Sequence, residues 1–158
     1  REDGYPMKVS VITVSDELYL KESKDDPGKR VEAVLKEAFP GAETYTSVVP
    51  RDEIKILDAF LEHLQSDMIL TLGGEGLSDG DIIPEVTEEY CQRSLPGVSQ
   101  VLRDALIHKY PLAMFFRGWA GVRGGTIIVN LPLQEDQALV CVKTLLPVME
   151  EAGKLLDE

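Results

Sequence analysis

The feature that most constrains the fold of this chain is the alternation of short β-branched runs with longer segments whose apolar residues recur at helical spacing. Runs of Val, Ile, Thr and Leu predict strands, and apolar residues three and four positions apart predict the buried faces of helices. The predicted strands span residues 8–14, 44–49, 67–72 and 126–130. The predicted helices run from Lys29 to Phe39 and over residues 52–64, 85–93 and 98–109, with a last one from Gln137. Because strand–helix–strand order is typical of a parallel sheet covered by helices, we predict a three-layer α/β fold with a mostly parallel sheet and helices on both faces.

One domain accounts for the whole sequence. A chain of 158 residues can bury a core without disulfides or metals, and we find no internal repeat or linker in it. We interpret residues 1–7 as a flexible leader and residues 8–158 as the domain. Residues 15–28 are polar and charged and predict a long surface loop, while Pro147 either kinks the last helix or starts a new one.

Charge and composition argue against several classes of function. The net charge of −12 disfavours nucleic-acid binding, which needs a basic surface to neutralise phosphates. No apolar run approaches the roughly 20 residues of a membrane-spanning helix, and no charged-then-apolar leader is present. Cys91 and Cys141 lie far apart in predicted helices, which favours two reduced thiols over a disulfide or a metal site. These features predict a cytoplasmic protein that binds neither nucleic acid nor membrane.

A glycine-rich segment, Gly73-Gly-Glu-Gly-Leu-Ser-Asp-Gly-Asp81, directly follows the third predicted strand. Open α/β sheets bind ligands beyond the carboxyl ends of their strands, and this segment is at such an end. Glycines let the backbone approach a ligand closely and expose N–H groups to an anion, and a helix after Pro84 adds a positive dipole end. The spacing matches neither a P-loop nor a dinucleotide fingerprint. The segment predicts an anion-binding loop, and the alternative is a glycine-rich turn without a ligand.

Motif blocks along almost the whole chain, from about Lys8 to Leu156, carry a resemblance to a known family. They are Thr13-Val-Ser-Asp16, Val49-Pro50, the segment from Gly73 to Asp81, Pro84-Glu-Val-Thr87, Pro96-Gly97, Pro111-Leu-Ala-Met114, Arg117, Ala120-Gly-Val-Arg-Gly124 and Thr126-Ile-Ile-Val-Asn-Leu-Pro132. With these blocks in this order, the chain resembles the molybdopterin-binding family of molybdenum-cofactor synthesis. That family includes the bacterial molybdopterin adenylyltransferases and the G domain of gephyrin and its plant counterpart.

The resemblance implies a nucleotidyltransferase that joins the terminal phosphate of molybdopterin to the AMP part of ATP and releases pyrophosphate with Mg²⁺ present. Asp81 matches the loop aspartate of the family, so the resemblance implies that it is catalytic and holds the Mg²⁺ ion, with Asp52 as a second catalytic residue. A homotrimer is implied as well. The implied ligand-binding residues are Thr13, Ser15, Asp16, Gly73, Gly74, Glu75, Gly76, Leu77, Ser78, Arg117, Gly121, Arg123, Asn130 and Pro132.

Several positions depart from the motifs of the family, and they lie where its chemistry is expected. Glu75 stands where the family has threonine, Asp79-Gly80 stand in place of Pro-Arg, and Arg51 stands in the place of an aspartate. Other departures are Ile83 for threonine, Phe116 for serine, and residues 133–136 for Gly-Ser-Pro-Lys. Most of these changes remove hydroxyls and cations or add carboxylates. The alternatives to an adenylyltransferase are therefore a catalytically impaired ligand-binding or scaffolding domain of the same fold, and an enzyme acting on another nucleotide-linked substrate.

Overall fold

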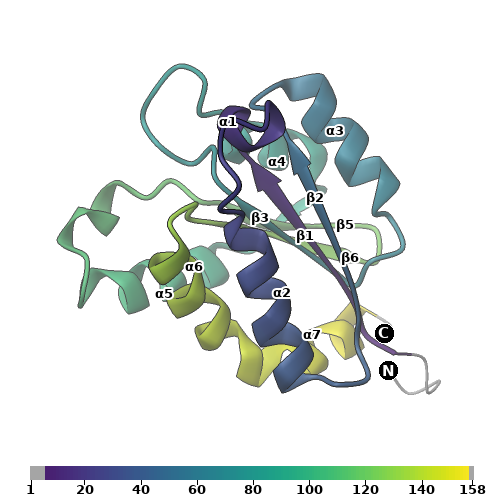
Figure 1. Ribbon diagram of the computed structural model, residues 1–158. Coiled ribbons are helices and arrows are strands. Elements are labelled where there is room, and N and C mark those ends of the chain that lie inside the picture. Colours follow the sequence, from purple (N-terminus) through teal and green to yellow (C-terminus); the bar gives the residue numbers. More distant parts are fainter. Residues whose placement is uncertain (1–5, 157–158) are drawn as a thin grey trace.

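The computed structural model describes residues 6–156, and one mixed sheet forms the middle layer of this part of the chain (Figure 1). Its strands are β1 (Lys8–Val14), β2 (Glu43–Val49), β3 (Met68–Leu72), β4 (Arg93–Ser94), β5 (Ala120–Arg123) and β6 (Thr126–Leu131). The strand order is β2-β1-β3-β6-β5-β4. The four strands β2, β1, β3 and β6 run parallel, whereas β5 is antiparallel to β6 and β4 is antiparallel to β5.

Helices cover both faces of the sheet (Figure 1). They are α1 (Asp16–Tyr19), α2 (Pro27–Ala38), α3 (Glu53–Glu62), α4 (Ile83–Tyr90), α5 (Pro96–Ile107), α6 (Glu135–Leu145) and α7 (Met149–Leu156), with short 3₁₀ turns η1 (Pro111–Phe115) and η2 (Leu146–Val148). On one face, α2, α5, α6 and α7 build a core that includes Val31 and Leu102. On the other face, α3 and α4 pack through Phe60 and Ile83. The predicted three-layer α/β fold is confirmed.

The central strands are buried on both faces, and this explains their continuous apolar sequences. Successive side chains of a strand point to opposite faces of the sheet. In β1, Val9 and Val11 join the core beneath α2 and α6, whereas Ile12 and Val14 join the core beneath α3 and α4. All five residues of β3 are buried. The short run 67–72 could therefore be recognised as a strand although it shows no polar–apolar alternation.

The structure corrects the sequence-based boundaries where short elements are involved. The predicted surface loop 15–28 contains α1, which is capped by the hydroxyl of Ser15, and α2 begins at Pro27 rather than at Lys29. The helix predicted over 85–93 starts at Ile83 and ends at Tyr90, so Arg93-Ser94 forms β4 instead. Strand β5 was not predicted either. Both strands are too short to show a periodic pattern. They form because β5 pairs with β6, and β4, at the edge of the sheet, pairs with β5.

The two ends of the described chain bear on two further predictions. Residues 1–5 of the predicted leader lie outside the described residues, while Met7 packs against the core and its carbonyl oxygen accepts a hydrogen bond from Glu43 N. Pro147 lies in η2, between α6 and α7, so it separates two helices. None of the helices within residues 6–156 is both long and apolar enough to cross a membrane.

Candidate functional site

Three chain segments converge where the parallel strands end. Thr13 in β1 pairs with Leu72 in β3, and Leu72 pairs with Leu131 in β6. The segments that follow these strands are therefore neighbours, and Gly73 N donates to the carbonyl oxygen of Leu131 at 3.2 Å. The fold thus brings the predicted residues at the ends of β1 and β6 together with the glycine loop, defined as residues 73–82.

Gly73 and Gly74 are required by the backbone. Both have positive φ angles, 97° and 74°, and both are buried. A Cβ atom on Gly73 would overlap the carbonyl oxygen of Val14, and one on Gly74 would lie 3.2 Å from Cβ of Ile83. These two glycines therefore fit the loop between β1 and α4. The first part of the loop is packed inside the protein, whereas Leu77, Ser78 and Asp79 are exposed.

Asp81 holds the exposed half of the glycine loop in place. Its Oδ2 atom accepts hydrogen bonds from Ser78 N at 3.1 Å and from Ser78 Oγ at 2.7 Å. Its Oδ1 atom accepts from Arg51 Nη1 at 3.3 Å. Partial burial tends to raise the pKa of Asp81, but the hydrogen bonds from Ser78 and Arg51 outweigh it, and the pKa falls below its ordinary value. The carboxylate is therefore charged at neutral pH, and both of its oxygens accept hydrogen bonds.

Arg51 lies between Asp81 and Asp16. Its backbone N donates to Asp16 Oδ1 at 2.8 Å and its Nε donates to Asp16 Oδ2 at 3.1 Å. Its Nη1 also donates to Ser78 Oγ at 3.2 Å. A Cβ atom on Gly80 would lie 2.9 Å from Arg51 Cζ, so the glycine makes room for the guanidinium. Sequence reasoning noted Arg51 only as a departure from the family and did not place it in the site.

Arg117, predicted to bind ligand, braces the same loop from the other side. Its Nε donates to the carbonyl oxygen of Gly76 at 2.9 Å, and its Nη2 donates to that of Asp81 at 2.8 Å. Its Nη1 forms an ion pair with Glu85 at 2.7 Å. Arg103 supports it in turn, because it donates to the carbonyl oxygens of both neighbours of Arg117 in the sequence, residues 116 and 118. The loop is thus held by two arginines from distant parts of the chain.

Glu75 turns inward to the segment after β6. Its Oε1 atom accepts a hydrogen bond from Leu133 N at 3.0 Å. Burial raises the pKa of this carboxyl, and the hydrogen bond from Leu133 lowers it in part, so that the pKa stays above its ordinary value. The backbone N–H group of Leu133 is therefore already bonded to the carboxylate of Glu75 in the glycine loop.

Two of the predicted ligand-binding residues are committed to internal contacts. Thr13 is fully buried and donates to Asp26 Oδ1 at 2.9 Å. Asn130 is also buried: its Oδ1 atom accepts from Trp119 N, and its Nδ2 atom donates to the hydroxyls of Thr71 and Thr87. These side chains tie β1 and β6 to their neighbours and leave no polar atom for a ligand.

Three more predicted residues lie outside the convergence point. Asp52 caps α3 by accepting from Lys55 N at 3.0 Å. Arg123 pairs with Thr126 at the amino end of β6, and its guanidinium lies over the ring of Tyr90, 5.0 Å from the centroid. Gly121 pairs with Ile128 in mid-strand. The structure therefore does not bring Arg123 or Gly121 to the glycine loop.

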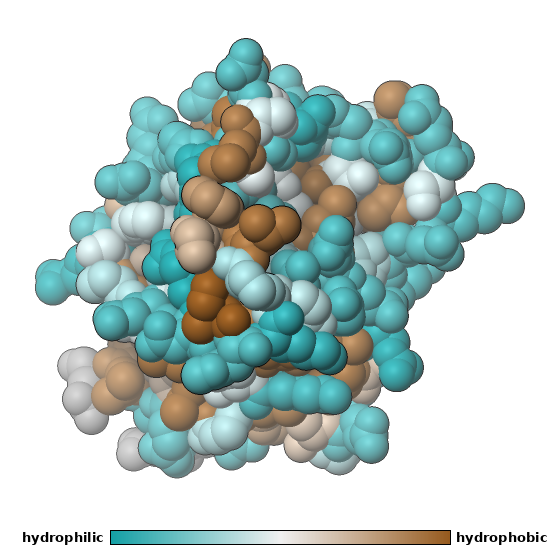
Figure 2. Space-filling model, turned by 90° about the vertical axis from the view of Figure 1, so that its left-hand side faces the viewer, coloured by the Kyte–Doolittle hydropathy of each residue, from teal (hydrophilic) through white to brown (hydrophobic). Residues whose placement is uncertain are grey.

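Clefts flank the loop on both sides. One of about 280 Å³ is lined by Val14, Ser15, Asp16, Glu17, Arg51, Gly74, Asp81 and Leu133. One of about 210 Å³ is lined by residues that include Glu75, Gly76, Leu77, Tyr110, Phe116 and Pro132. Figure 2 views the side of the molecule on which η1 lies and shows hydrophobic side chains gathered in a band among polar ones. The remaining predicted residues, Ser15, Asp16, Leu77, Ser78 and Pro132, thus border these clefts or the loop between them.

The loop offers N–H donors that the protein does not use. Within residues 6–156, the amide groups of Gly76 and Leu77 donate to no protein acceptor. Leu77 is 70% exposed. Arg117 contacts the carbonyl oxygen of Gly76 and adds a positive charge nearby. Unused amides close to such a charge are suited to binding an anionic group. The chain is thus an open α/β domain with a candidate ligand site on a glycine loop at the carboxyl edge of its sheet.

Comparison with known proteins gives the family within that class of domains. The chain belongs to the family described as "Probable molybdopterin binding domain", which matches residues 10–151. It is 29% identical over 145 residues to a molybdopterin adenylyltransferase of Helicobacter pylori, covering 89% of this chain and 82% of that protein. It is 30% identical to a probable molybdopterin adenylyltransferase of Methanocaldococcus jannaschii, covering 95% and 92%. The crystal structure of a molybdopterin biosynthesis protein from Mycobacterium abscessus superposes with a TM-score of 0.87 at 26% identity, covering 96% of each chain.

Proposed function

We propose that this protein acts in molybdenum-cofactor biosynthesis and adenylylates molybdopterin with ATP. The observation that carries the proposal is the glycine loop at the carboxyl edge, which lies between a cleft lined by Arg51 and a cleft lined by Gly76 and Leu77, whose amides are unused within residues 6–156. Membership of the family, and relatives named for this activity across most of their length, support it. A cytoplasmic location and a homotrimeric state are part of the same proposal.

The main task of the protein in this reaction is to position the two substrates. A terminal phosphate oxygen of molybdopterin bonds to the α-phosphorus of ATP, and the bond from that phosphorus to the bridging oxygen breaks, so that pyrophosphate leaves. The attacking phosphate is already an anion, hence no base has to remove a proton. Orientation and stabilisation of charge at the α-phosphate supply the rate. In this chain the amides of Gly76 and Leu77 and the free edge of Arg51 are the donors for the phosphates.

Carboxylates have positioning roles in this scheme. Asp81 fixes the loop through Ser78 and holds Arg51 in the cleft. Asp52 directly follows Arg51 and caps α3, so it helps to fix the position of the Arg51 backbone. The catalytic roles that the resemblance implied for these two aspartates stay predictions.

Magnesium accompanies the reaction that the resemblance implies, but the residues here do not fit a protein-bound ion. Both oxygens of Asp81 and both of Asp16 accept hydrogen bonds from Ser78 or Arg51. Within residues 6–156, no group of three or more His, Cys, Asp or Glu side chains is arranged to hold a metal. No step of the proposed reaction is therefore routed through a metal ion on the protein.

A second candidate function is a ligand-binding or scaffolding domain without transfer activity. The observation that favours it is that Arg51 and Arg117 both bind the protein's own carboxylates. An arginine already paired in this way contributes less to a phosphate.

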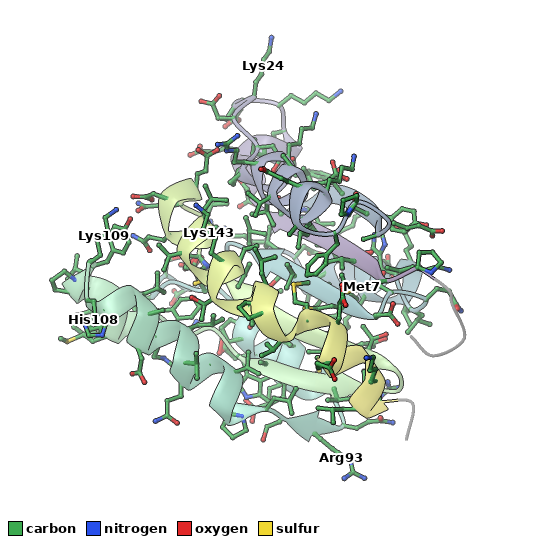
Figure 3. All side chains as sticks on the ribbon, turned by 90° about the horizontal axis from the view of Figure 1, so that it is seen from below. Met7, Lys24, Arg93, His108, Lys109 and Lys143 are labelled. Atoms are coloured by element: carbon green, nitrogen blue, oxygen red, sulfur yellow. The ribbon has the colours of Figure 1, made fainter. Side chains whose placement is uncertain are left out.

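The first prediction tests transfer directly. We expect pyrophosphate release and adenylylated product when the protein is incubated with molybdopterin and ATP. Arg117→Met should lower kcat/KM by about tenfold or more, because it removes charge-assisted hydrogen bonds that hold the loop. Arg93→Met is the matched control: Arg93 lies in β4 at the edge of the sheet, is exposed, and points outward from the molecule (Figure 3). If the folded wild type binds molybdopterin and ATP without releasing pyrophosphate, the transferase function is contradicted and the second candidate, a binding domain, is supported.

A further inference from the structure

Arg51 occupies the space between two carboxylates that come from different loops. Asp16 follows β1 and Asp81 ends the glycine loop, and 65 positions separate them in the sequence. The guanidinium joins them, with Nε 3.1 Å from Asp16 Oδ2 and Nη1 3.3 Å from Asp81 Oδ1. Two carboxylates that face each other across a ligand cleft are a common setting for a divalent cation. Here an arginine side chain stands between them.

We propose that Arg51 is the resident cation of this site: it takes the place of a protein-bound divalent metal, and the protein binds the phosphate groups of a nucleotide without such a metal. That the ligand is a nucleotide rests on the proposed function. That Arg51 takes the place of a metal ion between Asp16 and Asp81 is independent of it.

Geometry favours the arginine over a metal ion. Mg²⁺ requires oxygen ligands at about 2.0–2.1 Å in near-octahedral order, whereas every oxygen of the two carboxylates already accepts a hydrogen bond. The guanidinium also has a prepared position, because Gly80 lacks the Cβ atom that would lie 2.9 Å from Arg51 Cζ. A metal ion could enter only if Arg51 left both partners. Arginine stays charged at any ordinary pH, so the positive charge is permanent.

Arg51 still has donors to give to a ligand. Its Nε and Nη1 atoms are used, but within residues 6–156 its Nη2 atom has no acceptor. The side chain is 34% exposed and lines the 280 Å³ cleft together with Ser15 and Gly74. Since Arg51 and its two carboxylates together carry one negative charge, a phosphate is held there by directed N–H donors rather than by net attraction. The amides of Gly76 and Leu77 are further donors on the other side of the glycine loop, where these residues line the neighbouring cleft.

The test has a metal arm and a nucleotide arm. In the metal arm, Mn²⁺ is titrated into the protein alone and the free ion is followed by electron paramagnetic resonance. We expect no site in the wild type and a new site in Arg51→Asp, which brings a third carboxylate between Asp16 and Asp81. Stoichiometric Mn²⁺ binding by the wild type that is absent from the double variant Asp16→Asn/Asp81→Asn would overturn the proposal. Circular dichroism confirms that each variant is folded.

In the nucleotide arm, ATP binding is measured by calorimetry in EDTA and in excess Mg²⁺. Wild type should bind ATP in EDTA, and Arg51→Met should bind it about tenfold more weakly, the usual effect of losing one charge-assisted hydrogen bond. Arg51→Asp should bind ATP only with Mg²⁺, and the control Arg93→Met should equal the wild type. Wild-type binding that disappears in EDTA contradicts the proposal. Absence of ATP binding under both conditions contradicts both the proposed function and the proposal that a nucleotide binds at Arg51. The Mn²⁺ titration then still tests whether Arg51 or a metal ion lies between Asp16 and Asp81.

Discussion

At the scale of single residues, Glu75 is the departure whose environment is the most unfavourable for its charge. Burial raises its pKa above the ordinary 4.5, and the Leu133 N–H group offsets this only in part. A group whose pKa is raised on folding stabilises the protein below its unfolded pKa and loses that contribution as pH rises through the folded pKa. The charge on Glu75 therefore works against the folded state at neutral pH.

Glu75→Gln should consequently be more stable than the wild type at pH 7.5, by about 1 kcal/mol, the common size of a single-residue effect. The amide oxygen of glutamine can still accept from Leu133 N, so the contact survives. Urea unfolding at pH 7.5 and at pH 4 measures the difference, which should vanish at the lower pH. A variant that is less stable than the wild type at pH 7.5 but not at pH 4 would contradict the prediction and show that the charge of Glu75 has a partner that stabilises it.

At the scale of elements, α5 positions the segment from which Arg117 reaches the loop. Arg103 on α5 donates to the carbonyl oxygens of Phe116 at 2.9 Å and Gly118 at 3.2 Å, and its guanidinium lies 5.9 Å from the centroid of the Phe116 ring. Arg103 touches no part of the glycine loop in these contacts. It acts as a positioning residue, through Arg117.

A double-mutant cycle tests this coupling. Arg103→Met should lower the free energy of unfolding by about 1–3 kcal/mol, because it removes hydrogen bonds to a charged group. ATP affinity should fall in Arg103→Met and in Arg117→Met, and the double variant should lose less than the sum of the two effects. Additive losses of affinity would show that Arg103 stabilises α5 without acting on the loop. Arg93→Met serves again as the control.

At the scale of the whole molecule, apolar side chains remain exposed on η1 and next to it. Leu112 is 77% exposed, Met114 65% and Phe115 53%, and Figure 2 shows hydrophobic side chains gathered on this side of the molecule. Exposed apolar groups that lie together commonly mark contacts with another protein. The homotrimer that the family resemblance implies predicts that the partner is a second copy of this chain.

Light scattering should therefore give a mass above that of one chain, 17.5 kDa, and three times that value for the predicted trimer. Met114→Glu combined with Phe115→Glu should shift the mass to that of one chain, because a charge in an apolar contact is costly. Ile54→Glu, at an exposed position on α3, is the matched control. A wild type that scatters as a monomer at micromolar concentration removes the prediction.

Local sequence patterns suffice to predict the layers of the fold and the edge of the sheet where the candidate site lies. Residues 8–14, 67–72 and 126–130 are strands because apolar β-branched runs of that length suit the buried middle of a parallel sheet, and they are found there as β1, β3 and β6. Parallel strands end at the same edge, so the glycines after residue 72 had to lie at that edge with Ser15 and Pro132. Local periodicity and chain direction suffice for these conclusions.

Which charged side chains contact one another could not be predicted from the sequence and is seen in the folded protein alone. Arg51 and Asp81 are 30 positions apart, Arg117 and Gly76 are 41 apart, and Glu75 and Leu133 are 58 apart. No periodic pattern links such residues, because their contacts depend on how loops close over the sheet. For the same reason Arg123 matched a motif yet lies at the opposite end of β6, over Tyr90. The helix α1 and the strands β4 and β5 were missed because elements of two to four residues are set by long-range partners, whereas sequence patterns report mainly on short-range order.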